Sequence, residues 1–278
     1  MNKVGQRLCV FFFGLPLAIA LVWFNSFHHI AFHAVIFAAS ALGSGELYNL
    51  LRHKMPVQPR PLAIIAAVLP AFVAAVCAVL ELPSVYITYA LIVSILAVMA
   101  YEVLAVSSFE DSVFHLASSV FVILYTGFLV TFVSRMTMLS ASREFIAIFI
   151  LMVSMCDSVA WFFGVLFGKN NKGFIKASPN KSVAGFIGGF AGSILSGIIG
   201  WLVLPEVFTG SIVKVICLGI VMAFASIVGD LAESVLKRSA GIKDSGTIVP
   251  GRGGVLDSID SIIFAAPIYY FGISVLFL

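Results

Sequence analysis

The chain has 278 residues, of which 61% are hydrophobic and only 10% are charged, and its mean hydropathy is +1.13. Soluble domains carry about 25% charged residues, so this composition excludes a soluble globular protein and predicts an integral membrane protein. The formal net charge of +3 is too small to indicate a nucleic-acid partner.

Nine apolar segments are long enough to cross a bilayer, which takes about 20 residues per helix. They lie near residues 8–25, 28–46, 62–80, 84–106, 113–134, 143–168, 183–204, 211–236 and 258–278. The predicted fold class is therefore all-α, a polytopic integral membrane protein of about nine transmembrane helices. Lys3 and Arg7 precede the first apolar run as in a signal peptide, but no small-residue cleavage site follows, so we expect a retained first span. Residues 47–61, which contain three prolines, are expected to form a short interfacial helix or a solvated loop.

The placement of lysine and arginine predicts the orientation, because cytoplasmic loops are enriched in these residues. With the N-terminus inside, 13 bases fall on the inner side: Lys3, Arg7, Arg52, Lys54, Arg60, Lys169, Lys172, Lys176, Lys181, Lys237, Arg238, Lys243 and Arg252. Three fall outside, namely Arg135, Arg143 and Lys214. An odd number of spans then gives an N-in/C-out protein of the cell's inner (cytoplasmic) membrane.

We divide the chain by expected role. Residues 1–110 form N-terminal transmembrane helices that pack and face lipid, and residues 111–278 form a transmembrane catalytic region with cytoplasmic loops 169–182 and 237–257. The four cysteines lie in apolar stretches without metal-ligand spacing, so we expect buried apolar side chains. They are Cys9, Cys77, Cys156 and Cys217.

Residues 229–261, which we call the polar cassette, interrupt the apolar pattern with five acids and four bases. These are Asp230, Glu233, Asp244, Asp257 and Asp260, with Lys237, Arg238, Lys243 and Arg252. Ionisable groups at membrane depth are costly, so a cluster of this kind predicts function. Carboxylates and bases beside glycines suit the binding of a metal ion and a chain of phosphates.

Spacing within the cassette predicts shared helix faces. Four polar residues of the eighth span are four, three and four positions apart, and they are Ser226, Asp230, Glu233 and Lys237. An interhelical hydrogen-bond network is the structural alternative, but it would use amides and hydroxyls more than full charges. Asp257 and Asp260 share a face at the start of the last span, where an N-cap role explains only one of them. We expect Asp230, Asp257 and Asp260 to converge as a hard oxygen site for Mg²⁺.

The turn at residues 250–254 holds three glycines, whose backbone N–H groups can approach a phosphate closely. Gly253 and Gly254 are therefore candidate phosphate contacts, and Arg252 can grip phosphate oxygens with two donors. A glycine-rich loop alone is weak evidence, since membrane loops need turns as well. The neighbouring acids and bases strengthen the interpretation.

A second cluster precedes the seventh span. Asp157 lies inside the sixth span, where an acid is either functional or neutralised by a partner. Lys181 follows Ser178 and Pro179 at the start of the next helix, whose dipole favours a bound anion. Glu46 and Glu102 also lie near membrane depth, either as packing partners or at a lipid entrance, and the sequence leaves both readings open.

The cassette resembles the signature of the phosphatidate cytidylyltransferase, or CDP-diacylglycerol synthase, family. The matching elements are Ser234, Lys237-Arg238, Lys243-Asp244, Pro250-Gly251-Arg252-Gly253-Gly254 and Asp257-Ser258-Ile259-Asp260. The segments around Asp157 and Ser178-Pro179-Asn180-Lys181 also look like family motifs, so the resemblance covers about residues 150–265. The departures are Arg252 in place of a histidine, Ser258 in place of an arginine and Ala184 in place of an acid.

The resemblance implies a nucleotidyltransferase that converts CTP and phosphatidate to CDP-diacylglycerol and diphosphate. A lipid phosphate oxygen would attack the α-phosphorus of CTP in line, with Mg²⁺ assistance and a second cation left open. The residues and the resemblance together indicate the catalytic set Asp230, Asp257, Asp260 and Lys237, of which the three acids are the metal ligands. Expected substrate-binding residues are Asp157, Ser178, Lys181, Ser226, Glu233, Arg238, Lys243, Asp244, Arg252, Gly253 and Gly254.

Beyond the two substrates, the expected partners are membrane lipids and a second copy of the chain in a homodimer, which the resemblance implies. Two other functions stay open at this point. A CTP-dependent lipid kinase of the polyprenol type would use similar phosphate chemistry but transfer the γ-phosphoryl group. A secondary transporter would use a charged pathway at membrane depth, without nucleotide turnover.

Overall fold

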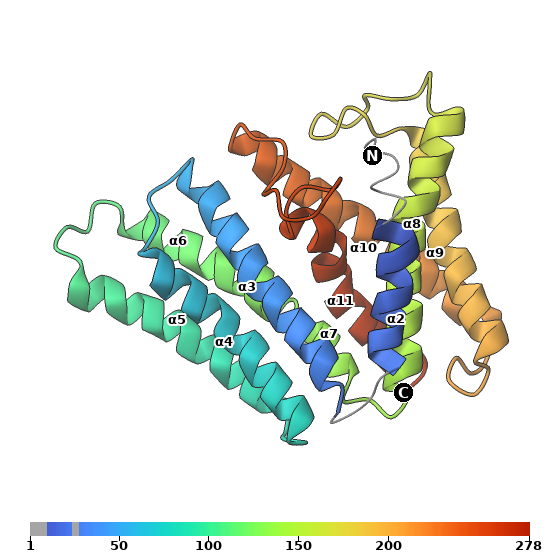
Figure 1. The fold of residues 1–278 in the computed structure, drawn as a ribbon, viewed down its shortest axis with the longest axis horizontal. Helices are drawn as coiled ribbons and strands as arrows, with labels where there is room; N and C mark the ends of the chain where they lie inside the picture. Colours follow the sequence, from blue (N-terminus) through green and yellow to red (C-terminus); the bar gives the residue numbers. More distant parts are fainter. Residues whose placement is uncertain (1–9, 24–27) are drawn as a thin grey trace. The chain divides into compact units, whose positions relative to one another are not determined.

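The structure is a computed structural model that describes residues 10–23 and 28–278. Within these ranges the chain is all-helical apart from two isolated β-bridges, and eight helices are long and apolar enough to cross a membrane. Figure 1 shows the helices and their labels. The predicted all-α, polytopic class is confirmed.

The chain folds as two compact units. Of the described residues, the first comprises 10–23, 139–235 and 260–278, and the second comprises 28–138 and 236–259. Helices α10 (Ile212–Ser239) and α11 (Leu256–Leu276) each contribute residues to both units. These units are defined by packing and not by function. The expected division into an N-terminal part, residues 1–110, and a catalytic region, residues 111–278, therefore stays a prediction.

The second unit is built from three long helices and one composite span. They are α3 (Ile30–Arg52), α4 (Arg60–Val79), α5 (Val85–Ala105) and the run α6 (Ser112–Val122), η2 (Ile123–Phe128) and α7 (Thr131–Met136). The π-helical segment η2 packs closely on its neighbours: Ser44 Oγ lies 2.7 Å from Thr126 Oγ1, and a Cβ at Gly127 would collide with the Ala67 backbone. Small and hydroxyl-bearing residues allow such close contact between membrane helices.

Helix α3 is longer than expected. It continues to Arg52, so residues 47–52 are not part of a separate interfacial helix, and only residues 53–59 form the connection to α4. Leu47, Leu50 and Leu51 are buried in this last stretch, and their packing extends the helix past Glu46. The prediction of an interfacial helix at 47–61 was wrong because Glu46 was read as the end of the apolar segment.

The first unit contains η1 (Val10–Gly14), α2 (Leu15–Trp23), α8 (Ser142–Phe167), α9 (Val183–Val203), most of α10 and most of α11. Glycines let α9 approach α8, since a Cβ at Gly188 would lie 2.8 Å from Phe163 and one at Gly189 would lie 3.2 Å from Cys156 Sγ. Ser182 is the N-cap of α9, where its hydroxyl accepts a hydrogen bond from Gly185 N at 3.1 Å. These contacts fix the segment that carries Lys181.

The predicted spans agree closely with the helices at 143–168, 183–204 and 84–106. The predicted first span, 8–25, contains a shorter apolar helix, Phe12–Trp23, while Lys3, Arg7 and Cys9 lie outside the described residues. Of the other cysteines, Cys77 and Cys156 are buried as expected and Cys217 is exposed.

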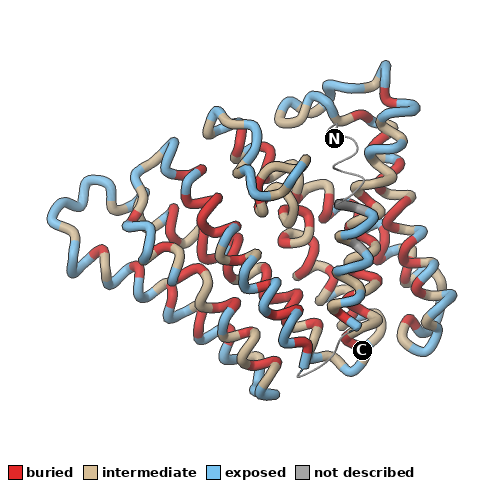
Figure 2. The backbone as a smooth tube through the Cα atoms, viewed as in Figure 1, coloured by how far each residue is buried: buried red, intermediate tan, exposed pale blue. Residues whose placement is uncertain are grey.

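Exposed positions on the helices carry large apolar side chains, as membrane-facing surfaces do. Ile65 of α4 and Leu96 of α5 are examples in the second unit. Figure 2 shows exposed and buried positions alternating along these helices. A water-soluble helix would place polar side chains at the exposed positions, so this pattern identifies a membrane protein.

Candidate functional site

Helix α10 ends in a hydrogen-bonded turn that begins the loop of the polar cassette. Gly241 adopts a positive φ of 74°, its N–H donates to Arg238 O at 3.1 Å, and Ile242 N donates to Lys237 O at 3.0 Å. This pair of bonds is a Schellman motif, which requires a left-handed residue and therefore favours glycine. The motif places Lys237 and Arg238 in the last turn, where cations are stabilised by the helix dipole.

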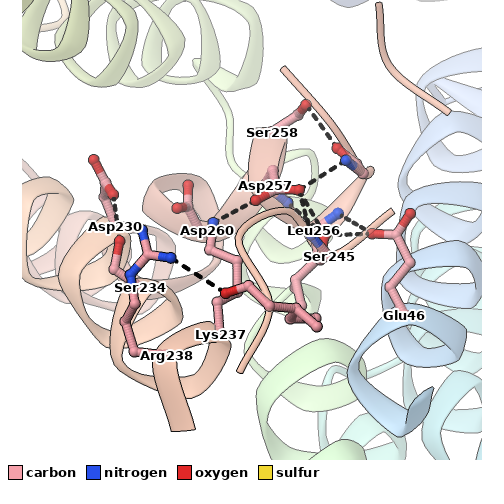
Figure 3. Close-up of polar contacts among 12 residues, drawn as sticks. Glu46, Asp230, Ser234, Lys237, Arg238, Ser245, Leu256, Asp257, Ser258 and Asp260 are labelled. Atoms are coloured by element: carbon pink, nitrogen blue, oxygen red, sulfur yellow. Dashed lines mark hydrogen bonds and ion pairs between the residues drawn. The ribbon is translucent and has the colours of Figure 1, made fainter. Parts of the chain in front are cut away.

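In the second unit, the Asp257 carboxylate is held by donors from three places (Figure 3). Its Oδ2 accepts from Ser245 N and Ser245 Oγ, both at 2.8 Å, and from Gly254 N at 2.7 Å. Its Oδ1 accepts from Lys237 Nζ. The Asp257 and Lys237 side chains are 5% and 11% exposed, so this ion pair is largely screened from water. A buried pair with additional hydrogen bonds holds its geometry firmly.

A further carboxylate, that of Glu46 on α3, enters the same cluster. It accepts from Val255 N at 3.0 Å, from Leu256 N at 2.7 Å and from Ser245 Oγ at 2.9 Å. The sequence had placed this residue only near membrane depth, as a packing partner or at a lipid entrance. Its structural role is a cap on the N-terminus of α11, supplied by a helix 210 positions earlier in the chain.

Three glycines of the loop make room for these two carboxylates. A Cβ at Gly246 or Gly254 would collide with the Glu46 carboxylate, and a Cβ at Gly253 would lie 2.7 Å from Asp257 Oδ2. Gly253 also has a φ of 117°, a conformation that side chains disfavour. The N–H groups of Gly253 and Gly254 already donate to Val249 O and Asp257 Oδ2. Their contact with a phosphate, predicted from the glycine-rich turn, stays a prediction.

Three bases at the end of α10 and in the loop that follows it are available for anions. Within the described ranges, Arg238, Lys243 and Arg252 form no ion pair, and Arg238 donates only to Ile242 O at 3.3 Å. Arg238 and Lys243 are exposed, as is Asp244, and Arg252 is half-buried. The basic charge of the loop is therefore not neutralised by neighbouring acids.

In the first unit, Asp230 of α10 forms an ion pair with Lys181. Lys181 Nζ lies 2.7 Å from Asp230 Oδ2, and the two side chains are 24% and 36% exposed. Ser234 Oγ donates to Asp230 Oδ1 at 3.4 Å, and Ser178 O accepts from Lys181 N at 3.1 Å. The structure thus brings together two residues that the sequence separates by about 50 positions.

Asp260 lies near three other acids of the first unit. Asp260 of α11 is in electrostatic range of Asp230, Glu233 and Asp157, which lie on α10 and α8. Asp260 is 6% exposed and Glu233 is fully buried. Ser226 is also buried, and its carbonyl accepts from Ser261 Oγ at 3.1 Å. The first unit thus brings several acids near Asp230, whose ion-pair partner is Lys181.

The acids do not form a complete metal site by themselves, but they suit the way in which proteins bind Mg²⁺. Among residues 10–23 and 28–278, no three His, Cys, Asp or Glu side chains are arranged as a ready-made metal site. Mg²⁺ does not require one, because it keeps several waters and usually takes one or two carboxylates together with substrate phosphates. Asp230, whose pair with Lys181 is partly exposed, and Asp260 are the residues of the first unit that could serve in this way.

The predicted site residues thus fall into two groups, one in each unit. The first unit holds Asp157, Ser178, Lys181, Ser226, Asp230, Glu233 and Asp260, and the second holds Lys237, Arg238, Lys243, Asp244, Arg252, Gly253, Gly254 and Asp257. Sequence reasoning missed Ser245 and the contacts of Glu46. The position of Glu46 could have indicated these contacts, because a single acid in an apolar helix needs hydrogen-bond donors from elsewhere in the chain.

The fold and these clusters define a class: a polytopic helical membrane protein in which each of the two units holds a cluster of acids and bases that includes residues of α10 and α11. The sequence model of the Cytidylyltransferase family matches residues 5–276. The chain belongs to this family.

Relatives of the chain are named phosphatidate cytidylyltransferases. The chain is 35% identical to the phosphatidate cytidylyltransferase of Staphylococcus saprophyticus over 172 residues, which are 61% of this chain and 63% of that protein. It is 28% identical to the chloroplastic phosphatidate cytidylyltransferase 5 of Arabidopsis thaliana over 274 residues, 86% of this chain and 65% of that protein. It is 43% identical to the Synechocystis phosphatidate cytidylyltransferase over 97 residues, 34% and 31% of the two chains. The chain therefore matches less than two thirds of the length of each.

Proposed function

We propose that the protein is a phosphatidate cytidylyltransferase, which forms CDP-diacylglycerol and diphosphate from CTP and phosphatidate. The observation that carries the proposal is a group of bases at the end of α10 and in the loop between α10 and α11. Arg238, Lys243 and Arg252 lie there without an acidic partner in the described structure, in a chain that belongs to the cytidylyltransferase family. Unneutralised bases beside a membrane surface suit a polyanionic nucleotide and a lipid phosphate.

In the proposed reaction, a phosphate oxygen of phosphatidate forms a bond to the α-phosphorus of CTP while the bond from that phosphorus to the β-phosphate bridging oxygen breaks. The nucleophile is already an anion, so the reaction needs no strong general base. The main barrier is the approach of two polyanions. Arg238, Lys243 and Arg252 would offset this repulsion and hold the triphosphate chain.

The acids would hold the cation that this chemistry uses. Bound Mg²⁺ would neutralise charge on the triphosphate and on the departing diphosphate. Asp230, Asp257 and Asp260 are the proposed ligands. In the structure Asp230 and Asp257 are each paired with a lysine, Lys181 and Lys237. We propose that these lysines neutralise the carboxylates before substrate binds and then turn to phosphate oxygens.

The proposed setting is the cytoplasmic membrane, with both loops 169–182 and 237–257 on the inner face, where CTP is available. The excess of lysine and arginine on that side supports this orientation. Membrane lipids and a second copy of the chain are proposed partners, the second from the family resemblance alone.

The test is product analysis. Purified protein in phosphatidate-containing vesicles is incubated with α-labelled CTP and Mg²⁺, and the lipid and aqueous products are separated. Label in the lipid fraction as CDP-diacylglycerol, with equimolar diphosphate, is the expected result. Release of CDP with a phosphorylated lipid would instead identify a lipid kinase. Flux across the vesicle membrane without nucleotide turnover would identify a transporter.

A further inference from the structure

The Glu46 carboxylate connects three parts of the second unit at one point (Figure 3). It projects from α3, is 7% exposed, and accepts three hydrogen bonds, from Ser245 Oγ, Val255 N and Leu256 N. Leu256 is the first residue of α11. The first backbone N–H groups of a helix have no partner inside the helix, so Glu46 satisfies that of Leu256 as well as the N–H of Val255, the residue before the helix.

The loop is shaped around this carboxylate. Gly246 and Gly254 lie so close to Glu46 that a Cβ at either position would collide with its oxygens. Two positions of the loop are thereby restricted to glycine by one distant side chain. This arrangement holds the start and the end of the 245–256 segment against α3.

Ser245 transmits the contact to Asp257. Its Oγ lies 2.9 Å from Glu46 Oε2 and 2.8 Å from Asp257 Oδ2, and its N–H donates to the same Asp257 oxygen at 2.8 Å. A serine hydroxyl has one proton, so Ser245 Oγ can donate to only one of the two carboxylates at a time, and it stays between them only while the backbone around it is held in place. Glu46 supplies that constraint through Val255 and Leu256.

We propose that Glu46 is a positioning residue for the reaction: it fixes the loop between α10 and α11 and, through Ser245, the orientation of the Asp257 carboxylate. This inference rests on the proposed function for the role of Asp257. Glu46 does not touch the substrates. It acts by keeping Asp257 in the geometry that lets Lys237 and the loop bases meet the phosphates.

Two variants, Glu46→Gln and Glu46→Asp, test whether Glu46 acts by positioning the loop or only by its negative charge. In Glu46→Gln one acceptor oxygen becomes an N–H₂ donor that faces the N–H of either Val255 or Leu256, so at least one of the three hydrogen bonds is lost. Glu46→Asp keeps the charge but loses the reach of one methylene. Glu102→Gln is the matched control, because Glu102 is 3% exposed in the same unit and is held by Gln58 and His115 rather than by the loop.

The experiment measures two quantities on the full-length proteins in nanodiscs. Hydrogen–deuterium exchange follows peptides that cover residues 244–257, and initial rates at saturating CTP give kcat and the KM for phosphatidate. For Glu46→Gln and Glu46→Asp we expect faster exchange in these peptides and a fall in kcat of about tenfold or more, with an unchanged KM for phosphatidate. Glu102→Gln should leave exchange in these peptides at the wild-type level.

Three outcomes would overturn the proposal. The first is wild-type exchange in Glu46→Gln, which would show that the loop does not depend on this residue. The second is faster exchange with unchanged kcat, which would make Glu46 a structural residue only. The third is full activity of Glu46→Asp, which would indicate a need for charge alone. If the wild-type protein forms no CDP-diacylglycerol, the proposed function fails, and the exchange measurement still decides whether Glu46 holds the loop.

Discussion

Asp230 and Asp257 are both proposed ligands, but their surroundings differ, and this predicts different mutant behaviour. Asp257→Asn would place an amide against Ser245 N–H and Gly254 N–H and leave Lys237 without its buried partner. We expect lost activity together with a loss of stability of about 1–3 kcal/mol, read as a lower unfolding temperature. Asp230 is 36% exposed, so Asp230→Asn should remove activity with little change in stability. Near-normal turnover of either variant at low Mg²⁺ would remove that residue from the ligand set.

Arg252 is the residue at which the chain departs most clearly from the pattern it resembles. An arginine can bind phosphate but cannot give up a proton at neutral pH, so its presence favours a binding role. Arg252→Ala should raise the KM for CTP about tenfold or more, with a smaller effect on kcat. An alanine variant with an unchanged CTP dependence would show that Arg252 does not contact the nucleotide.

Arg252→His tests the same role through pH. The introduced imidazole is charged below its ordinary pKa of about 6.5 and neutral above it. The variant should therefore bind CTP better at acidic pH, and its KM for CTP should rise as the pH increases through this range. The wild-type protein, which keeps its charge, provides the baseline at each pH. A histidine variant whose CTP dependence parallels the wild type across the range would contradict the binding role.

At the scale of elements, the loop between α10 and α11 is constrained by space as much as by backbone conformation. Gly254→Ala would drive a methyl group into Glu46 and Ser245, so we expect a marked loss of both stability and activity. Gly241→Ala is the matched control: it has a φ of 74° and nothing within 4 Å of its Cβ position, so only backbone strain of about 1 kcal/mol applies. Equal unfolding temperatures for the two variants would mean that the loop can move away from Glu46.

At the scale of the whole molecule, successive spans cross the membrane in opposite directions, which predicts that loops 169–182 and 237–257 lie on the same side of the membrane. In a background without the native cysteines, single cysteines replace Lys172, Thr247 and Thr209, which are all exposed. A membrane-impermeant maleimide should label the first two only from the cytoplasmic side and the third only from the other side. Labelling of positions 172 and 247 from opposite sides would contradict the proposed orientation and a common access to CTP.

The sequence alone determined the class of fold, because apolar runs of about 20 residues have few alternatives to a membrane-spanning helix. It also identified the polar cassette, because charges in such runs are too costly to be incidental. Helix spacing predicted one face for Ser226, Asp230, Glu233 and Lys237, since local periodicity needs no tertiary information; the first three lie in the first unit and Lys237 in the second. The end of α3 was misplaced because the sequence does not show that Glu46 would find donors at the N-terminus of α11.

Only the tertiary structure decided which charges meet. The pairing of Lys181 with Asp230 joins segments about 50 residues apart, and the cap that Glu46 places on α11 spans 210 residues. No periodicity encodes contacts of this length, because they depend on how the helices pack. The same holds for the glycines: the sequence predicted that Gly253 and Gly254 contact a phosphate, whereas the packing showed that Gly246 and Gly254 give space to a carboxylate.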